Sequence, residues 1–152
     1  MIVMKKIIIL VLILIAGYFL FFNDVKAPVD NIDNSIESIT YNNASASLIQ
    51  VELPFPGAVA GKEFSVIGQA RGNWFFEASF PIDLLDKDGN ILVQTYATAE
   101  GDWMTTDFVP FRGEVKAPIE YIGPATLVLK KDNPSDLREH DASISFPITV
   151  EY

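Results

Sequence analysis

The hydrophobic and polar positions of this 152-residue chain divide it into three stretches with different periodicity. Residues 7–22 are continuously apolar apart from Gly17, residues 24–47 show no sustained period, and the rest alternates between apolar and polar positions. A long apolar run predicts a membrane segment, whereas alternation at period two predicts half-buried strands. We therefore expect an N-terminal membrane segment over 1–23, a flexible polar linker over 24–47 and one folded domain over 48–152.

The clearest alternation predicts a strand in which Phe76, Ala78, Phe80, Ile82 and Leu84 face the core. Neighbouring side chains of a strand point to opposite faces, so Phe75 and Glu77 should then face outward. Alternation also appears over 64–70 and 144–150, and shorter candidates lie at 48–53, 91–99, 103–108 and 125–131. About seven short strands without a helical segment between them predict an all-β, immunoglobulin-like antiparallel sandwich, with a small barrel as the alternative. Because proline cannot donate to a strand ladder, Pro81 and Pro147 should lie at an edge or a bulge.

The N-terminal run follows Lys5 and Lys6, which place the N-terminus in the cytoplasm under the positive-inside rule. Sixteen apolar residues exceed the usual core of a secretory signal, and no good small-residue cleavage site follows them. We predict one uncleaved transmembrane helix, a single-pass anchor in the cytoplasmic membrane that leaves the C-terminal domain extracytoplasmic. Secretion after signal cleavage is the alternative. Within the linker, a short helix over 34–41 competes with a coil.

Composition narrows the chemistry of the folded part. The chain carries 11 Lys+Arg against 20 Asp+Glu, a formal charge of −9, which argues against a nucleic-acid partner. It has no cysteine and one histidine, so thiolate or multi-histidine metal sites, a disulfide framework and a cysteine nucleophile are excluded. We expect no cofactor and no resident metal.

Two short motifs resemble sites but have simpler interpretations. The segment Asp86-Lys87-Asp88-Gly89-Asn90 superficially resembles the start of a calcium loop, with carboxylates on alternate residues and a glycine for a sharp bend, yet the twelfth position of such a loop would be Ala97 instead of Glu. We interpret it as a hairpin turn. His140, between two acidic residues and near Ser143, makes a serine hydrolase formally available. No G-x-S-x-G elbow is present, so a loop histidine is the simpler interpretation.

The aromatic stretch that begins at Arg71 offers the best candidate contacts. Trp74, Phe75 and Phe76 cannot all face one core, so an aromatic at a strand end beside Arg71 could form a recognition patch. Trp103 repeats the pattern of a turn followed by tryptophan. The competing interpretation places Trp74 in the core between two sheets and Phe75 under a loop. Asn133 belongs to a long Asn-Pro-Ser loop at the end of the predicted sandwich, where binding surfaces are often built.

Three blocks resemble the immunoglobulin-like domain of bacterial spore germination proteins. They are RGNWFFEASFPIDLLDKDGNIL, ATAEGDWMTTDFVPF and LVLKKDNPSDLREHDASISFPITV, in that order, and the resemblance spans roughly 49–150. It implies an extracytoplasmic immunoglobulin-like sandwich and no catalytic residue.

We therefore expect a non-enzymatic binding or scaffold module of the bacterial cell envelope, attached to the membrane through its N-terminal helix. Its ligand would be an unknown envelope protein or a cell-wall glycan. A carbohydrate-binding module is the first alternative, because an exposed tryptophan at 74 or 103 would stack on sugars. A hydrolase that uses His140 is the second.

Overall fold

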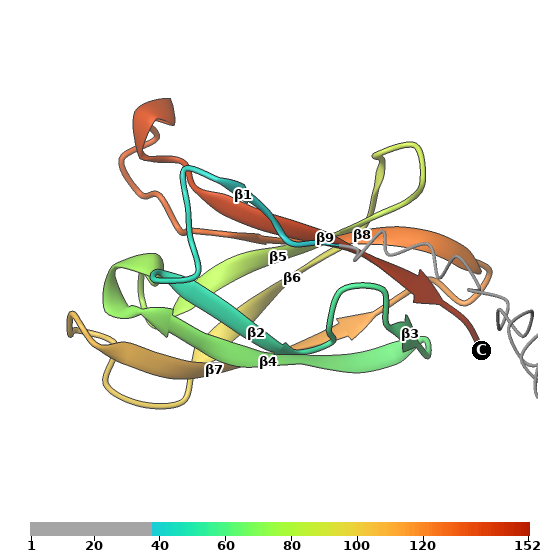
Figure 1. Cartoon of the computed structure of the whole chain (residues 1–152), viewed down its shortest axis with the longest axis horizontal. Helices are drawn as coiled ribbons and strands as arrows, with labels where there is room; N and C mark the ends of the chain where they lie inside the picture. Colours follow the sequence, from blue (N-terminus) through green and yellow to red (C-terminus); the bar gives the residue numbers. More distant parts are fainter. Residues whose placement is uncertain (1–37) are drawn as a thin grey trace, which may run out of the picture. The chain divides into compact units, whose positions relative to one another are not determined.

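The computed structural model describes residues 38–152, which belong to one compact unit that starts at Ser35. The described part is all-β apart from two short 3₁₀ helices (Figure 1). Its strands are β1 (Thr40–Asn42), β2 (Ile49–Leu53), β3 (Val59–Ala60), β4 (Glu63–Arg71), β5 (Ser79–Leu85), β6 (Ile91–Ala99), β7 (Phe108–Lys116), β8 (Gly123–Lys130) and β9 (Ser143–Val150). The 3₁₀ helices are η1 (Gly72–Trp74) and η2 (Arg138–His140).

The nine strands form one curled sheet in the order β1-β9-β8-β5-β6-β7-β4-β2, with β3 added beside β9. All pairs are antiparallel except β3 with β9. Figure 1 shows β9, β8 and β5 in one layer and β2, β4 and β7 in the other. Strand β6 connects the layers, because it pairs with β5 over its whole length but with β7 only through residues 97–99.

A glycine permits this connection between the two layers. A side chain at Gly113 would place its Cβ 2.7 Å from the Ile82 side chain and 3.1 Å from the backbone oxygen of Tyr96. Because such distances are closer than carbon contacts allow, only glycine lets β7 approach β6 and the core at this corner.

The core lies between the two layers and consists of the inward residues of the strands. Phe80, Ile82 and Leu84 are fully buried, as the alternation over 80–84 predicts. Strand β9 confirms the same pattern, with buried Ile144, Phe146, Ile148 and Val150. The prediction of an all-β, mostly antiparallel domain is therefore confirmed, although the described strands form one curled sheet and number nine, two more than expected.

The predicted register fails at the start of β5. Phe76 is 41% exposed and Phe75 only 4%, so the predicted inward and outward positions are both wrong. The strand begins at Ser79, after a tight turn in which Glu77 and Ala78 have positive φ angles of 49° and 63°. This turn, closed by mutual backbone hydrogen bonds between Phe76 and Ser79, interrupts the period of two.

Asp83 also departs from its expected environment. Its position on β5 faces away from the core, yet the residue is 1% exposed. Its carboxylate accepts a hydrogen bond of 2.8 Å from the Gln94 amide and forms an ion pair with Lys130. A buried carboxylate needs such partners because its desolvation is costly.

Three further segments differ from the prediction. The strand expected at 103–108 begins only at Phe108 and continues to Lys116, because residues 104–107 form bends. Residues 40–42, expected in the linker, form β1, which pairs with β9. Residues 40 and 41 are therefore in a strand and not in the short helix that was the alternative over 34–41. The two-residue strand β3 was not expected either.

Neither proline lies on an edge strand, but each occupies a gap in the pairing. Pro81 pairs with Tyr96 of β6 and lies just before the first residue of β5 that pairs with β8. Pro147 pairs with Thr126 of β8 on one side. On its other side, residues 143–145 pair with β1 and residues 149–150 pair with β3, so Pro147 lies in the gap between them. Proline has no backbone N–H to donate, and each of these prolines lies where its strand has no second neighbouring strand, as the prediction reasoned.

The expected anchor at 7–22 and the linker up to residue 37 lie outside the described residues. Within 38–152, no helix is long and apolar enough to cross a membrane.

Candidate functional site

Four loops gather at one end of the domain, which we call the loop end. They are residues 43–48, 72–78, 100–107 and 131–142, and Figure 1 shows them on the left. Hydrogen bonds join them in pairs: the Asn43 amide donates to the backbone oxygen of Asp141 (3.0 Å), and the Asp132 N–H donates to the oxygen of Trp74 (3.1 Å). Loops tied together in this way form a preorganised surface.

Arg71, a predicted contact residue, connects three of the loops. Its Nε donates to the backbone oxygen of Ser47 (3.1 Å) and its Nη1 to that of Thr106 (3.2 Å). The guanidinium carbon lies 4.0 Å from the centre of the Phe108 ring, a cation–π contact. Arg71 therefore holds the loop end together.

Trp74 and Phe75 are core residues. Trp74 is 1% exposed and packs edge-on against Phe80, with ring centres 6.4 Å apart, while Phe75 packs against the same ring at 5.3 Å. Helix η1 turns the chain so that both rings point inward. The recognition patch predicted at these two residues is therefore wrong for the described surface, and the competing core interpretation is confirmed. The Trp74 Nε1 has no hydrogen-bond partner among the described residues.

Trp103 is the predicted contact that stays at the surface. Its side chain is half-buried against the core and lines an open hollow with Gly72, Phe75 and Met104, of which Met104 is 77% exposed. The floor requires a glycine, because a Cβ on Gly72 would lie 2.0 Å from the backbone oxygen of Thr105. The hollow holds about 490 Å³, and Asn73, Thr105 and Thr106 complete its lining.

Asn133 organises its own loop. Its amide nitrogen donates to the Leu137 backbone oxygen and to the Asp141 carboxylate, both at 2.8 Å, and its oxygen accepts from the Ser135 hydroxyl at 2.6 Å. With these bonds made, the side chain shapes the loop and contributes little to a surface contact.

His140 does meet a serine, because Ser135 Oγ lies 3.1 Å from its Nδ1. The pair lacks the third group of a hydrolase. Ser135 donates its hydroxyl to Asn133, and no carboxylate of the described residues bonds to the His140 ring. Without a carboxylate that orients the imidazole, a serine nucleophile is not activated in the usual way. Both residues are exposed on a loop.

The segment 86–90 forms the predicted hairpin turn between β5 and β6. The Asp86 carboxylate accepts hydrogen bonds from the backbone N–H groups of Asp88 and Asn90, both at 2.8 Å, and from the Asn90 amide at 2.9 Å. The Asn90 side chain, followed by its backbone N–H, is the main cause that lowers the pKa of Asp86 below its ordinary value. Gly89 supplies the positive φ of 84°. Within 38–152, no three His, Asp or Glu side chains are grouped so that they could hold a metal ion.

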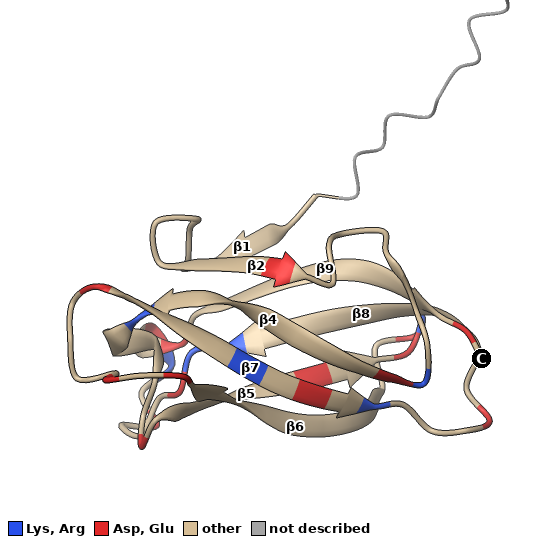
Figure 2. Cartoon of the chain, turned by 90° about the horizontal axis from the view of Figure 1, so that it is seen from below, with Lys and Arg blue, Asp and Glu red and all other residues tan. Residues whose placement is uncertain are grey.

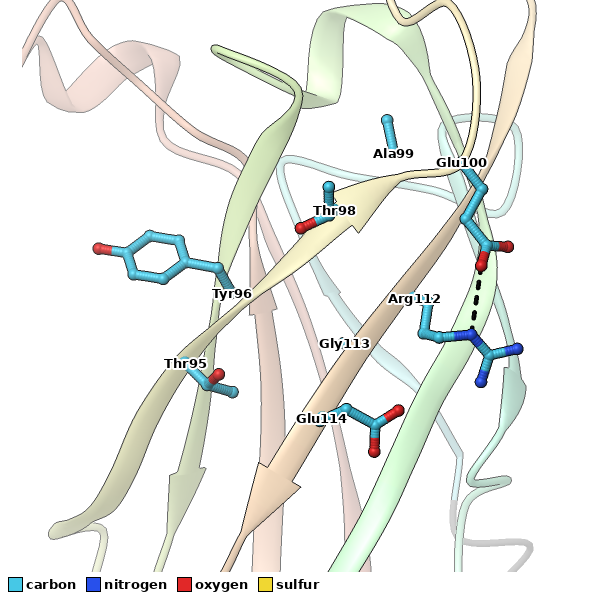
Figure 3. Close-up of a pocket in the computed structure, with 8 residues that line it drawn as sticks. All are labelled: Thr95, Tyr96, Thr98, Ala99, Glu100, Arg112, Gly113 and Glu114. Carbon is cyan, nitrogen blue, oxygen red and sulfur yellow. Dashed lines mark hydrogen bonds and ion pairs between the residues drawn. The ribbon is translucent and has the colours of Figure 1, made fainter.

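A second open hollow, which no sequence pattern predicts, lies where β6 separates from β7. It holds about 420 Å³ and is lined by residues of both strands, drawn in Figure 3. The Arg112 Nε donates to the Glu100 carboxylate at 3.2 Å on one side, while Tyr96 points away from them on the other. Only the pairing of β6 and β7, which sequence periodicity does not reveal, brings these residues together.

A comparison of the amino-acid sequence with known protein families supports the observed fold. Residues 48–137, more than half of the chain, match the family profile described as the immunoglobulin-like domain of bacterial spore germination. The search of curated proteins found no match, and the search of solved structures found none. The matched region runs from residue 48, just before β2, into the loop that precedes η2, and so contains two of the four loops of the loop end entirely and residues 131–137 of a third. The chain belongs to the family of immunoglobulin-like domains of bacterial spore germination.

Proposed function

We propose that this protein is a non-enzymatic binding or scaffold module of the bacterial cell envelope that recognises a partner protein through its loop end. The immunoglobulin-like family suggests such a role and is not a known catalytic fold. The observation that carries the proposal is the hollow beside Trp103 and Met104, in which apolar side chains are exposed on loops that Arg71 holds in place.

Several properties of this surface suit a protein ligand. Tryptophan, methionine and arginine are enriched at protein interfaces, where a half-buried aromatic acts as an anchor. The exposed Met104 adds a flexible apolar side chain that adapts to a partner. Because the loops are hydrogen-bonded to one another, little conformational entropy is lost when the partner binds.

The location of the module is part of the proposal. We propose that residues 7–22 anchor the chain in the cytoplasmic membrane and that the domain lies outside the cytoplasm, as the lysines before the apolar run favour. A mature N-terminus at Pro28, seen by mass spectrometry of the native protein, would instead show a cleaved signal. An intact Met1 or Ile2 with the protein in the membrane fraction after carbonate extraction is the expected result.

The cell-wall glycan alternative is weaker because Trp74 is buried. Only Trp103 could stack on a sugar, and its indole is half-buried beside Phe75. Co-sedimentation with purified peptidoglycan tests it directly. Binding that Trp103→Ala abolishes would favour the glycan over a protein.

Photo-cross-linking in living cells tests the proposed function. A photoreactive amino acid at Met104 should give a discrete adduct with another envelope protein, because the side chain lies on the proposed contact surface. The matched control is Lys87, whose side chain is also largely exposed but lies in the β5–β6 turn. Equal adducts from both positions, or none from Met104, would contradict the proposal.

A further inference from the structure

Strand β6 has an edge that no neighbouring strand covers. Its residues 97–99 pair with β7, but residues 91–96 pair only with β5 among the strands of the described domain. Figure 3 shows the two strands diverging beyond Gly113, where the open hollow lies. The backbone groups on this side of residues 91–96 are therefore available to another strand.

This edge lacks most of the features that normally prevent strands from associating. Proteins protect edges with charged residues, prolines, bulges that interrupt pairing, or very short strands. The segment Ile91-Leu92-Val93-Gln94-Thr95-Tyr96 has no charge and no proline. Its one irregularity is a bulge at Leu92, which has no partner between Ile91 and Val93, whereas residues 93–96 pair regularly with β5.

The other edges of the described sheet are protected. Strand β2 contains Glu52 and an irregular register at residues 51–53, β1 has three residues, and β3 has two. The diverging end of β7 carries Glu114 and Lys116. Figure 2 shows this contrast, since β7 has acidic and basic segments whereas β6 has none.

We propose that a second copy of this chain occupies the β6 edge, pairing its own residues 91–96 antiparallel about a two-fold axis near Gln94. An antiparallel pair can be symmetric, so one surface serves both copies. Each chain has a formal charge of −9, and contact between two copies costs least repulsion along a segment without charge.

The ends of the segment support self-pairing. Antiparallel pairing about Gln94 places Tyr96 of one copy, which is 56% exposed, opposite Leu92 of the other copy, and Ile91, which is 59% exposed, lies beside that Leu92. Aromatic and β-branched residues are favourable neighbours across strands. The contact is small compared with obligate interfaces, so the dimer should depend on concentration. This surface lies on the side of the domain and is separate from the loop end.

Disulfide cross-linking tests the pairing because the chain has no cysteine. In the full-length protein in mild detergent, Gln94→Cys should form a disulfide-linked dimer on oxidation, since residues at the axis have Cα atoms within the 4.4–6.8 Å that a disulfide spans. The matched control is Thr98→Cys, an exposed residue with the same orientation on the same strand. Its two copies would lie about 26 Å apart at 3.3 Å per residue. We expect at least fivefold more dimer from Gln94→Cys.

Two further measurements complete the test. Adding Tyr96→Glu to Gln94→Cys should reduce the dimer at least fivefold, because it places a carboxylate on each edge. Light scattering of the unmodified chain in detergent should give a mass that rises toward two chains with concentration, and Tyr96→Glu should stay at one. Equal cross-linking of both cysteine variants, no effect of Tyr96→Glu, or an unmodified chain that is monomeric at all concentrations would overturn the proposal. An adduct of Gln94→Cys with a different protein, without self-dimer, would also overturn it.

Discussion

Replacing Phe80 with alanine should nearly unfold the domain, whereas replacing Phe76 should not. Phe80 is fully buried and contacts the rings of Trp74, Phe75 and Phe111, with the last ring centre 4.9 Å away. Losing such a ring costs about 3–5 kcal/mol through lost burial and the remaining cavity. The aromatic contacts favour the upper part of that range. Phe76 lies on the tight turn and is 41% exposed, so its loss should cost no more than about 1 kcal/mol.

Urea denaturation of residues 35–152, followed by tryptophan fluorescence, measures both effects. A domain of this size has a total stability of about 5–15 kcal/mol and loses roughly 1–2 kcal/mol per molar urea. Phe80→Ala should therefore lower the midpoint by about 1.5–5 M, and Phe76→Ala by no more than about 1 M. The reasoning would be refuted if Phe76→Ala proved as destabilising as Phe80→Ala, because strand parity would then continue through the turn.

Three other variants test separate parts of the structure by the same assay. Gly72→Ala should cost about 1–3 kcal/mol, because its Cβ would overlap a backbone oxygen of the 103–107 loop; an unchanged midpoint would show that the loops move apart freely. Lys130→Met should cost about 1.5–3 kcal/mol by removing a charged partner of buried Asp83, and a neutral result would show that Gln94 alone is sufficient. The pKa of Asp86 is lowered in the folded state, so its stabilisation is present above the pKa of the unfolded chain and is lost as pH falls through the folded pKa. Asp86→Ala should thus destabilise the domain at neutral pH and not in strong acid, and a difference that persisted in acid would contradict this assignment. Millimolar calcium should leave the midpoint unchanged, because the Asp86 oxygens already accept three hydrogen bonds.

Periodicity predicted most strands because one face of each strand is buried. The inward residues of β4, β8 and β9 alternate almost without interruption, and the 86–90 turn carries the Asp-Gly pair that a hairpin requires. Alternation does not reveal the full length of β7, because Gly113 interrupts its series of inward apolar residues and Pro110, at an outward position, is a residue that strands usually exclude.

The candidate site could be predicted only in part, for a local reason. The positive φ angles that break the register belong to Glu77 and Ala78, residue types that give no turn signal in a sequence. Alternation alone therefore predicts that the β5 strand extends back through Phe76, and it does not decide whether Trp74 is buried or exposed. The gathering of Arg71 and Trp103 depends on contacts between loops far apart in the chain, which no local pattern encodes.

One cross-linking measurement tests most directly whether the loop end is the binding surface. It compares the unchanged hollow with one in which Met104 is replaced. The photoreactive amino acid is placed at Asn73, which is exposed beside Met104, and the adduct with the envelope partner is quantified with and without Met104→Ser. The substitution removes an exposed apolar side chain, so the urea midpoint should not change while the adduct falls at least fivefold. An adduct of unchanged yield, with the midpoint also unchanged, would contradict the account.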